Sequence, residues 1–157
     1  MISAFRIQLI RGLHNLRAEG RGCVLTVGKF DGLHRGHQAL LTQTVQQARA
    51  VGLPATVLSF DPSPREFFSP DKAPPRISTL RDKLLGLQEQ GIDRLVLARI
   101  DQRIADTASS AFLEDILIRQ FGVRTLVVGD DLRFGRGRAG DISYLQSRAD
   151  ELGYRVI

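Results

Sequence analysis

The run CVLTV at residues 23–27 leads directly into GKFDGLHRGH at residues 28–37. Its apolar and β-branched residues predict a short strand that is buried on both faces, as in a parallel sheet. Polar and apolar residues then alternate at helical spacing from residue 38 to residue 51. A buried strand that passes through a glycine-rich turn into a helix indicates the first unit of an α/β domain.

Four later segments repeat one pattern, in which a helical stretch is followed by a glycine and then by a short run rich in Val, Leu and Thr. The helical stretches are residues 38–51, 80–90, 111–121 and 142–152, and the runs are residues 55–59, 94–97, 125–128 and 154–157. Glycine just past a helix is the usual left-handed cap. The alternation predicts a parallel sheet with helices on both faces, and we expect residues 6–10 to add an edge strand.

Composition limits the class of protein. The chain has 157 residues, 43% hydrophobic and 25% charged, which fits one globular domain. No apolar run approaches the roughly 20 residues of a membrane span. The net charge of +5 suggests a nucleic acid or a small anionic ligand as partner. We favour the small anion, because the 17 acidic residues are interspersed throughout, and no Trp and only two Tyr are present to stack on bases.

The single cysteine, Cys23, cannot form an internal disulfide, and Arg6 interrupts the region where a signal peptide would be apolar. We therefore expect a cytoplasmic protein that binds neither membranes nor nucleic acid. Because the chain stops inside an expected core strand, we also expect that more chain follows in the intact protein.

Three segments of unusual composition follow expected strands, where doubly wound sheets bind their ligands. In the first, residues 28–37, the glycines and a helix N-terminus suit a phosphate group, and His34 and His37 share one helix face. The alternative is a glycine-rich turn with exposed or capping histidines. The second, SFDPSPREFF at residues 59–68, offers aromatic rings to a flat ligand or to the end of the sheet. The third, VGDDLRFGRGRAGD at residues 128–141, is either a solvated loop or a phosphate clamp.

The first segment resembles the signature of the HxGH nucleotidyltransferases, and the others narrow the resemblance. Together with RISTLRDK at residues 76–83, they resemble the N-terminal adenylyltransferase module of bacterial bifunctional riboflavin kinase/FMN adenylyltransferases, along essentially the whole chain. The resemblance implies a Rossmann-like nucleotidyltransferase fold. It also implies the reaction ATP + FMN → FAD + pyrophosphate, with Mg²⁺ bridging the phosphates of ATP.

The resemblance also implies roles for individual residues. His34 and His37 are expected to be catalytic. The residues expected at ATP are Gly28, Phe30, Asp31, Gly32, Gly36, Asp131 and Arg136. The residues expected at the flavin are Phe60, Pro62, Pro64, Phe68 and Phe134. No residue is assigned as a metal ligand.

The chain departs from the family pattern at Lys29, Ser63 and Leu132, where Asn, His and Phe are common. The family's ISST-x-x-R segment and its riboflavin kinase module are not found within residues 1–157. We therefore interpret residues 1–157 as an FMN adenylyltransferase domain truncated at its C-terminus, with low activity alone, whose intact form also phosphorylates riboflavin to FMN. The alternatives are a non-catalytic nucleotide- or flavin-binding module and a nucleotidyltransferase acting on another phosphate.

Overall fold

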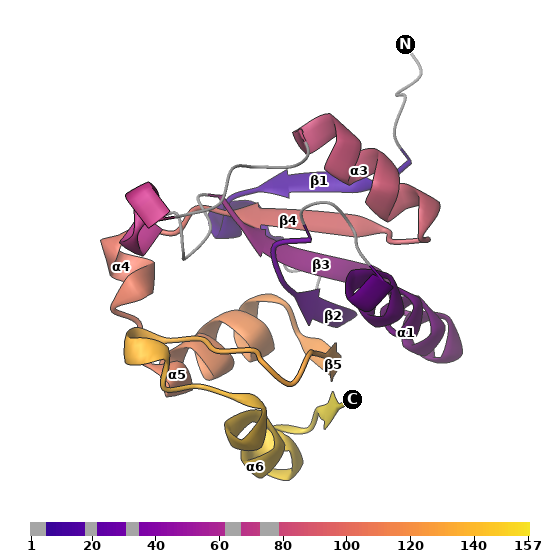
Figure 1. The fold of residues 1–157 in the computed structure, drawn as a ribbon. Coiled ribbons are helices and arrows are strands. Elements are labelled where there is room, and N and C mark those ends of the chain that lie inside the picture. The colour runs from indigo at the N-terminus through magenta and orange to yellow at the C-terminus, as the bar shows by residue number, and fades with distance from the viewer. Residues whose placement is uncertain (1–5, 18–21, 31–34, 62–66, 73–78) are drawn as a thin grey trace.

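A computed structural model describes residues 6–17, 22–30, 35–61, 67–72 and 79–157. They form a six-stranded sheet in the order β1-β4-β3-β2-β5-β6 (Figure 1). The strands are β1 (Gln8–Arg11), β2 (Cys23–Val27), β3 (Ala55–Phe60), β4 (Arg94–Ala98), β5 (Val123–Val127) and β6 (Arg155–Val156). All five strand pairings are parallel, which confirms the α/β class expected from the sequence.

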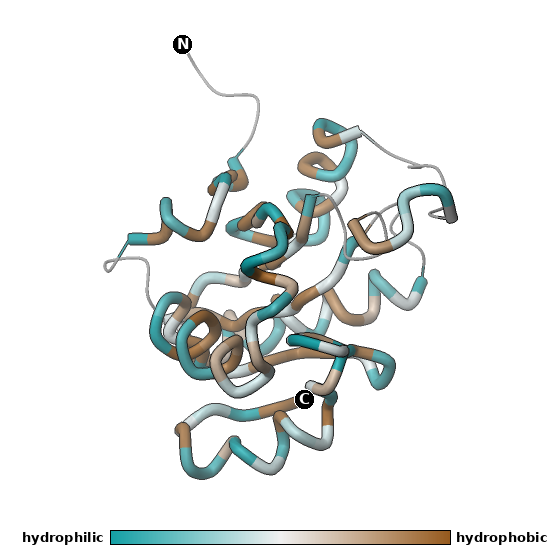
Figure 2. The backbone as a smooth tube through the Cα atoms, turned by 90° about the vertical axis from the view of Figure 1, so that its left-hand side faces the viewer, coloured by the Kyte–Doolittle hydropathy of each residue, from teal (hydrophilic) through white to brown (hydrophobic). Residues whose placement is uncertain are grey.

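Helices cover both faces of the sheet. One core holds apolar residues of α1 (Arg35–Val51) and α3 (Leu80–Glu89). The other holds those of η4 (Phe112–Gln120) and α6 (Ile142–Leu152). In β3, Val57 belongs to the first core and its neighbour Leu58 to the second, because successive strand residues point to opposite faces. Figure 2 shows hydrophobic and hydrophilic residues alternating around the helices, as one-sided burial requires.

Local sequence signals set the ends of these helices. Thr79 and Asp141 cap α3 and α6 by accepting hydrogen bonds from backbone N–H groups of the first turn. Gly153 ends α6 in the left-handed conformation, at φ 77°, and donates its N–H to Ala149 O. The expected helix–glycine–strand pattern is thereby confirmed.

The segment expected as a regular helix at 111–121 differs in its hydrogen bonding. It starts as α5 (Ser109–Ala111) and continues as the π-helical η4, in which the N–H of Phe121 bonds to Ile116 O. Because a π turn is wider than an α turn, side chains four or five residues apart lie on the same face of this helix. It therefore brings Phe112, Ile116 and Phe121 onto one buried face, with Leu113 and Leu117 beside them.

The order of the strands reverses beside β2. From β2 the chain moves to β3 and then to β4 on one side, whereas β5 returns to the other side of β2. The carboxyl ends of neighbouring strands at such a reversal form the usual ligand-binding crevice of an α/β sheet. By this rule, we expect the candidate site at the loops after β2 and β5. Within the described parts of the chain, no helix is long and apolar enough to cross a bilayer.

Candidate functional site

The glycine-rich loop after β2 is held against the end of β3. Gly28 donates its N–H to Leu58 O at 3.0 Å, and the buried hydroxyl of Ser59 donates to Lys29 O at 3.3 Å. A Cβ at Gly28 would lie 2.9 Å from the ring of Phe30, so any side chain there would displace that ring. Glycine at residue 28 thus permits the chain to turn tightly over an aromatic residue.

Phe30 is the buried base of this loop. It is 1% exposed and lies in the core formed with α1. Its backbone is left-handed, at φ 51°, which is uncommon for an aromatic residue and occurs where surrounding packing enforces it. Its ring packs against that of His37, with centroids 5.0 Å apart. The structure therefore places Phe30 beneath His37, and its expected contact with ATP stays a prediction.

His37 and Gly36 lie in the first turn of α1, which begins at Arg35. The first N–H groups of a helix lack intrahelical partners and favour an anion. Both residues therefore lie at the positively polarised end of α1, where His37 is half-buried and Gly36 is exposed. Five of the predicted site residues lie outside the described residues: Asp31, Gly32, His34, Pro62 and Pro64.

The loop after β5 approaches α1 from the other side of the strand reversal. A Cβ at Gly129 would lie 3.1 Å from Oδ1 of Asp131 and 3.9 Å from the side chain of Leu40 in α1. The carboxylate of Asp131 is therefore folded back over Gly129, and Gly129 lies near Leu40 in the second turn of α1. That Asp131 and the start of α1 share one ligand stays a prediction.

Farther along, the same loop is closed at its base. Phe134 and Gly140 exchange two backbone hydrogen bonds, of 3.0 and 2.9 Å. The closed loop carries η5 (Arg136–Arg138) at its tip, where both arginines are exposed. A guanidinium at an exposed, fixed tip is suited to bind phosphate groups.

The predicted flavin residues occupy two different environments. Phe134 is 9% exposed and packs between Phe112 and Tyr144, with ring centroids 5.4 and 6.2 Å away. The ring centroid of Phe112 also lies 6.4 Å from that of Phe60. Phe60 and Phe134 thus belong to one aromatic row. Phe68, by contrast, is 60% exposed and meets only Phe67 among the described aromatic residues, edge-on at 5.1 Å.

The sequence did not indicate that Phe112 and Tyr144 also belong to this row, next to the predicted flavin residue Phe134. Phe112 lies in the helical stretch expected at 111–121, on its buried face. No local signal indicated that this face also supports the loop after β5, because the contact joins residues far apart in the sequence.

Cys23 is excluded as a nucleophile. It is fully buried at the start of β2, at the edge of the sheet opposite the glycine-rich loop. Burial raises the pKa of its thiol to about 11, although the Arg94 guanidinium and the Thr56 hydroxyl oppose that shift. A neutral, inaccessible thiol takes no part in the chemistry considered below.

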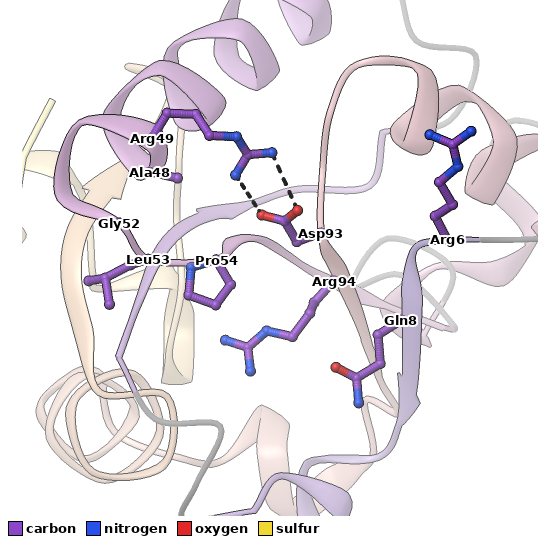
Figure 3. A pocket seen from close by; sticks show the side chains of 9 residues that line it. All are labelled: Arg6, Gln8, Ala48, Arg49, Gly52, Leu53, Pro54, Asp93 and Arg94. Carbon is purple, nitrogen blue, oxygen red and sulfur yellow. Dashed lines mark hydrogen bonds and ion pairs between the residues drawn. The ribbon is translucent and has the colours of Figure 1, made fainter.

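The described residues contain no group of three or more His, Cys, Asp or Glu side chains arranged to hold a metal ion. A pocket of about 560 Å³ lies at the amino ends of β1, β3 and β4 (Figure 3). Within it, Arg49 donates to both oxygens of Asp93 at 2.9 and 3.3 Å, and Ala55 N–H donates to Asp93 at 2.8 Å. The pocket is separate from the candidate site, because parallel strands place their amino and carboxyl ends at opposite edges of the sheet.

The parallel sheet, the strand reversal beside β2 and the HxGH sequence that leads into α1 define a nucleotidyltransferase-like α/β domain. The chain belongs to the FAD synthetase family, whose profile matches residues 16–157. It is 46% identical over 151 residues to the bifunctional riboflavin kinase/FMN adenylyltransferase of Escherichia coli K12, covering 96% of this chain and 48% of that protein.

Relatives of the same name confirm this similarity. The protein from Pseudomonas fluorescens is 45% identical, over 96% of this chain and 48% of its own length. The protein from Haemophilus influenzae is 40% identical, over 96% of this chain and 49% of its own length. The chain thus spans about half the length of these curated relatives.

A crystal structure described as a macrolide-efflux protein from Streptococcus pneumoniae has the same fold. It superposes with a TM-score of 0.80 at 24% identity, over 96% of this chain and 50% of the other. At that identity the likeness concerns the fold alone.

Proposed function

We propose that this domain transfers the adenylyl group of ATP to the phosphate of FMN. An oxygen of the FMN phosphate forms a bond to the α-phosphorus of ATP, the bond from that phosphorus to the bridging oxygen breaks, and pyrophosphate leaves. The products are FAD and pyrophosphate. The attacking phosphate is already an anion at neutral pH, so the protein needs to position the substrates and stabilise charge rather than activate a nucleophile.

One observation carries the proposal: β2 and β5 are parallel neighbours at the strand reversal, so the loops that follow them leave the same edge of the sheet. The loop after β2 leads to His37 in the first turn of α1, and the loop after β5 carries Asp131, folded over Gly129. A triphosphate in this crevice would face backbone N–H groups and an imidazole. Family membership supports ATP as the occupant.

His34 and His37 are proposed as the catalytic donors. Each would donate a hydrogen bond to phosphate oxygens whose negative charge grows as pyrophosphate leaves. The position of His37 on the first helical turn supports this role, because the helix N-terminus favours the same anion. Gly28, Phe30, Asp31, Gly32 and Gly36 would shape the ATP side of the crevice, and Asp131 and Arg136 would close it.

The flavin ring is proposed to lie against the loops after β3 and β5. Phe60, Pro62, Pro64, Phe68 and Phe134 are its proposed contacts. The exposed ring of Phe68 supports this arrangement, since it offers a flat apolar face to a ligand.

Mg²⁺ is proposed to enter with ATP. The chemistry of the site fits a hard cation, since Asp130 and Asp131 present exposed carboxylates at the end of β5. When bound, the ion would neutralise phosphate charge. Either carboxylate could hold it, directly or through water.

The longer protein is proposed to carry a second activity, the phosphorylation of riboflavin to FMN. This rests on the names of relatives that are about twice as long as the aligned region. Residues 1–157 are proposed to form the adenylyltransferase domain.

The direct test incubates the longer protein with ATP, Mg²⁺ and FMN, because residues 1–157 alone are expected to have low activity, and it follows FAD and pyrophosphate by chromatography. We expect both products in equal amounts. His37→Ala should abolish most of the FAD signal, whereas His14→Ala, at an exposed histidine in η1 (Leu13–Asn15) beside the far edge strand, should retain it. Binding of ATP and FMN without FAD would favour a non-catalytic binding module, and turnover of another phosphate acceptor instead of FMN would favour the other alternative.

A further inference from the structure

The segment between β4 and η4 contacts the arginine-bearing loop after β5 at several points. This connector runs from Asp101 to Ser109 and includes α4 (Gln102–Ala105). Figure 1 shows the segment that follows β5 reaching α4 and α5 before the chain enters α6. None of the residues in the connector belongs to the sequence motifs considered above.

Two hydrogen bonds tie the connector to the loop. Arg136 donates its backbone N–H to Thr107 O at 2.8 Å, and the hydroxyl of Ser109 donates to Phe134 O at 3.3 Å. Thr107 is itself fixed, because its hydroxyl donates to Arg103 O at 2.8 Å and its N–H donates to Ile104 O at 3.1 Å. The backbone of Arg136 is thereby tied to the end of α4.

The fit between Gly135 and Ser109 is close. A Cβ at Gly135 would lie 2.5 Å from Ser109 Oγ and 2.7 and 2.8 Å from its Cα and backbone N. Since two of these atoms are backbone, rotation of a side chain cannot relieve the overlap. Gly135 is also left-handed, at φ 79°. Only glycine therefore lets the loop lie directly on the connector.

The side chain of Arg136, by contrast, is left available. It is exposed, and within the described parts of the chain its guanidinium makes no hydrogen bond or ion pair. A cation with a fixed backbone and an available head group loses less conformational entropy when it binds an anion. This combination distinguishes a ligand-binding arginine from one that only stabilises the fold.

We infer that Thr107 and Ser109 are positioning residues for nucleotide binding: they hold the backbone at Phe134–Arg136 so that the guanidinium of Arg136 meets the phosphates of ATP. The inference rests on the proposed function for the identity of the ligand. It extends the site to a segment that lies outside the sequence motifs.

The test is a double-mutant cycle on the affinity for ATP, measured by calorimetry without FMN. Gly135→Ala should lift the loop off Ser109 and weaken ATP binding about tenfold, as should Arg136→Ala, which removes a charged donor. The double variant should bind ATP no more than about twofold more weakly than Arg136→Ala alone, because both changes remove the same interaction. Ser109→Ala removes only the hydroxyl, so it should weaken ATP binding by a smaller factor than Gly135→Ala. If Gly135→Ala does not fold, a cycle of Ser109→Ala with Arg136→Ala takes the place of the cycle with Gly135→Ala.

Gly153→Ala is the control for an alanine at positive φ. Gly153 has φ 77°, close to the 79° of Gly135, but its ψ is 35° rather than 177°, and a Cβ there meets nothing within 4 Å. It therefore places an alanine in the left-handed region without moving the loop, and it should keep its affinity for ATP within about twofold. Hydrogen exchange supplies a readout independent of ligands: the Arg136 amide should exchange faster in Gly135→Ala and unchanged in Gly153→Ala.

The positioning role would be overturned if Gly135→Ala binds ATP as tightly as the wild type. It would also be overturned if the loss of ATP affinity in the double variant equals the product of the losses in the two single variants. Intact ATP binding without FAD synthesis by the longer wild-type protein would instead contradict the proposed function and leave the positioning role standing.

Discussion

The rings of Phe30 and His37 lie 5.0 Å apart and are inclined by 60°, so the histidine at the start of α1 rests on a buried aromatic residue of the preceding loop. Phe30 is anchored in the core, and its ring leaves no room for a side chain at Gly28. The imidazole is therefore held at the start of α1 by packing as well as by the helix. This gives His37 a structural contribution that can be separated from its proposed chemistry.

The first prediction separates these two contributions. His37→Phe should keep the ring contact but remove both nitrogens, so stability should be nearly unchanged while kcat falls by about 10² to 10³, as for one lost preorganised donor. His37→Ala should lose the same activity and also about 0.5–1.5 kcal/mol of stability from the aromatic pair. Turnover and thermal unfolding are measured on both variants. Near-normal turnover by His37→Phe would contradict a catalytic role.

The second prediction concerns Phe68. Since its side chain is 60% exposed, Phe68→Ala should change stability by no more than about 0.5 kcal/mol. If the ring stacks on flavin, the affinity for FMN should fall about tenfold, which is the scale of one stacking contact. Quenching of flavin fluorescence measures the affinity. An unchanged affinity would remove Phe68 from the flavin site.

The third prediction is that Phe134 affects both binding and stability. Phe134→Ala should weaken flavin binding about tenfold or more and also destabilise the fold by up to about 3–5 kcal/mol, because it opens a cavity between Phe112 and Tyr144. Phe134→Leu fills most of that volume and serves as the control. If Phe134→Leu binds flavin as tightly as the wild type, the ring acts only through packing.

The fourth prediction concerns the carboxylate of Asp93. Burial alone would raise its pKa, but hydrogen bonds from Arg49 and from Ala55 N–H outweigh that effect and hold the pKa below its ordinary value. Its stabilising effect is therefore complete above the unfolded pKa of about 3.9 and is lost as the pH falls through the lower folded value. Asp93→Asn should cost about 1 kcal/mol at pH 7, since the pair is partly exposed.

Urea unfolding of Asp93→Asn and wild type should give converging stabilities as the pH drops below the unfolded pKa. A difference that stays constant down to pH 2 would show that the charge of Asp93 contributes nothing. Arg119→Ala supplies the control, because its ion pair with Asp115 is highly exposed and should matter little at any pH.

The fifth prediction uses Cys23 as a reporter. With its pKa raised to about 11 and its side chain fully buried, the thiol should not react with an aromatic disulfide reagent at pH 8 in the folded protein. It should react promptly in urea. Rapid labelling of the native protein would indicate that the start of β2 opens far more readily than a central strand should.

The local elements of this protein are determined by its sequence. β2 coincides with the predicted run at 23–27, and the predicted helix at 142–152 coincides with α6. Capping side chains, glycine stops and apolar periodicity act over a few residues, so they can be recognised without knowing the fold. The same holds for the glycine-rich loop at 28–37 and the arginine-bearing loop at 128–141, whose compositions made them candidates for phosphate binding.

Only the tertiary structure decided how these parts meet. Parallel strands are joined by long crossovers, and nothing local in the run that forms β5 indicates that it pairs with β2 rather than β4. With that pairing, Gly129 lies near Leu40 of α1, Phe134 is buried against Phe112, and Gly135 lies on Ser109. Each of these contacts joins distant segments through packing on both faces of the sheet, so their physical cause lies in the whole core rather than in any local pattern.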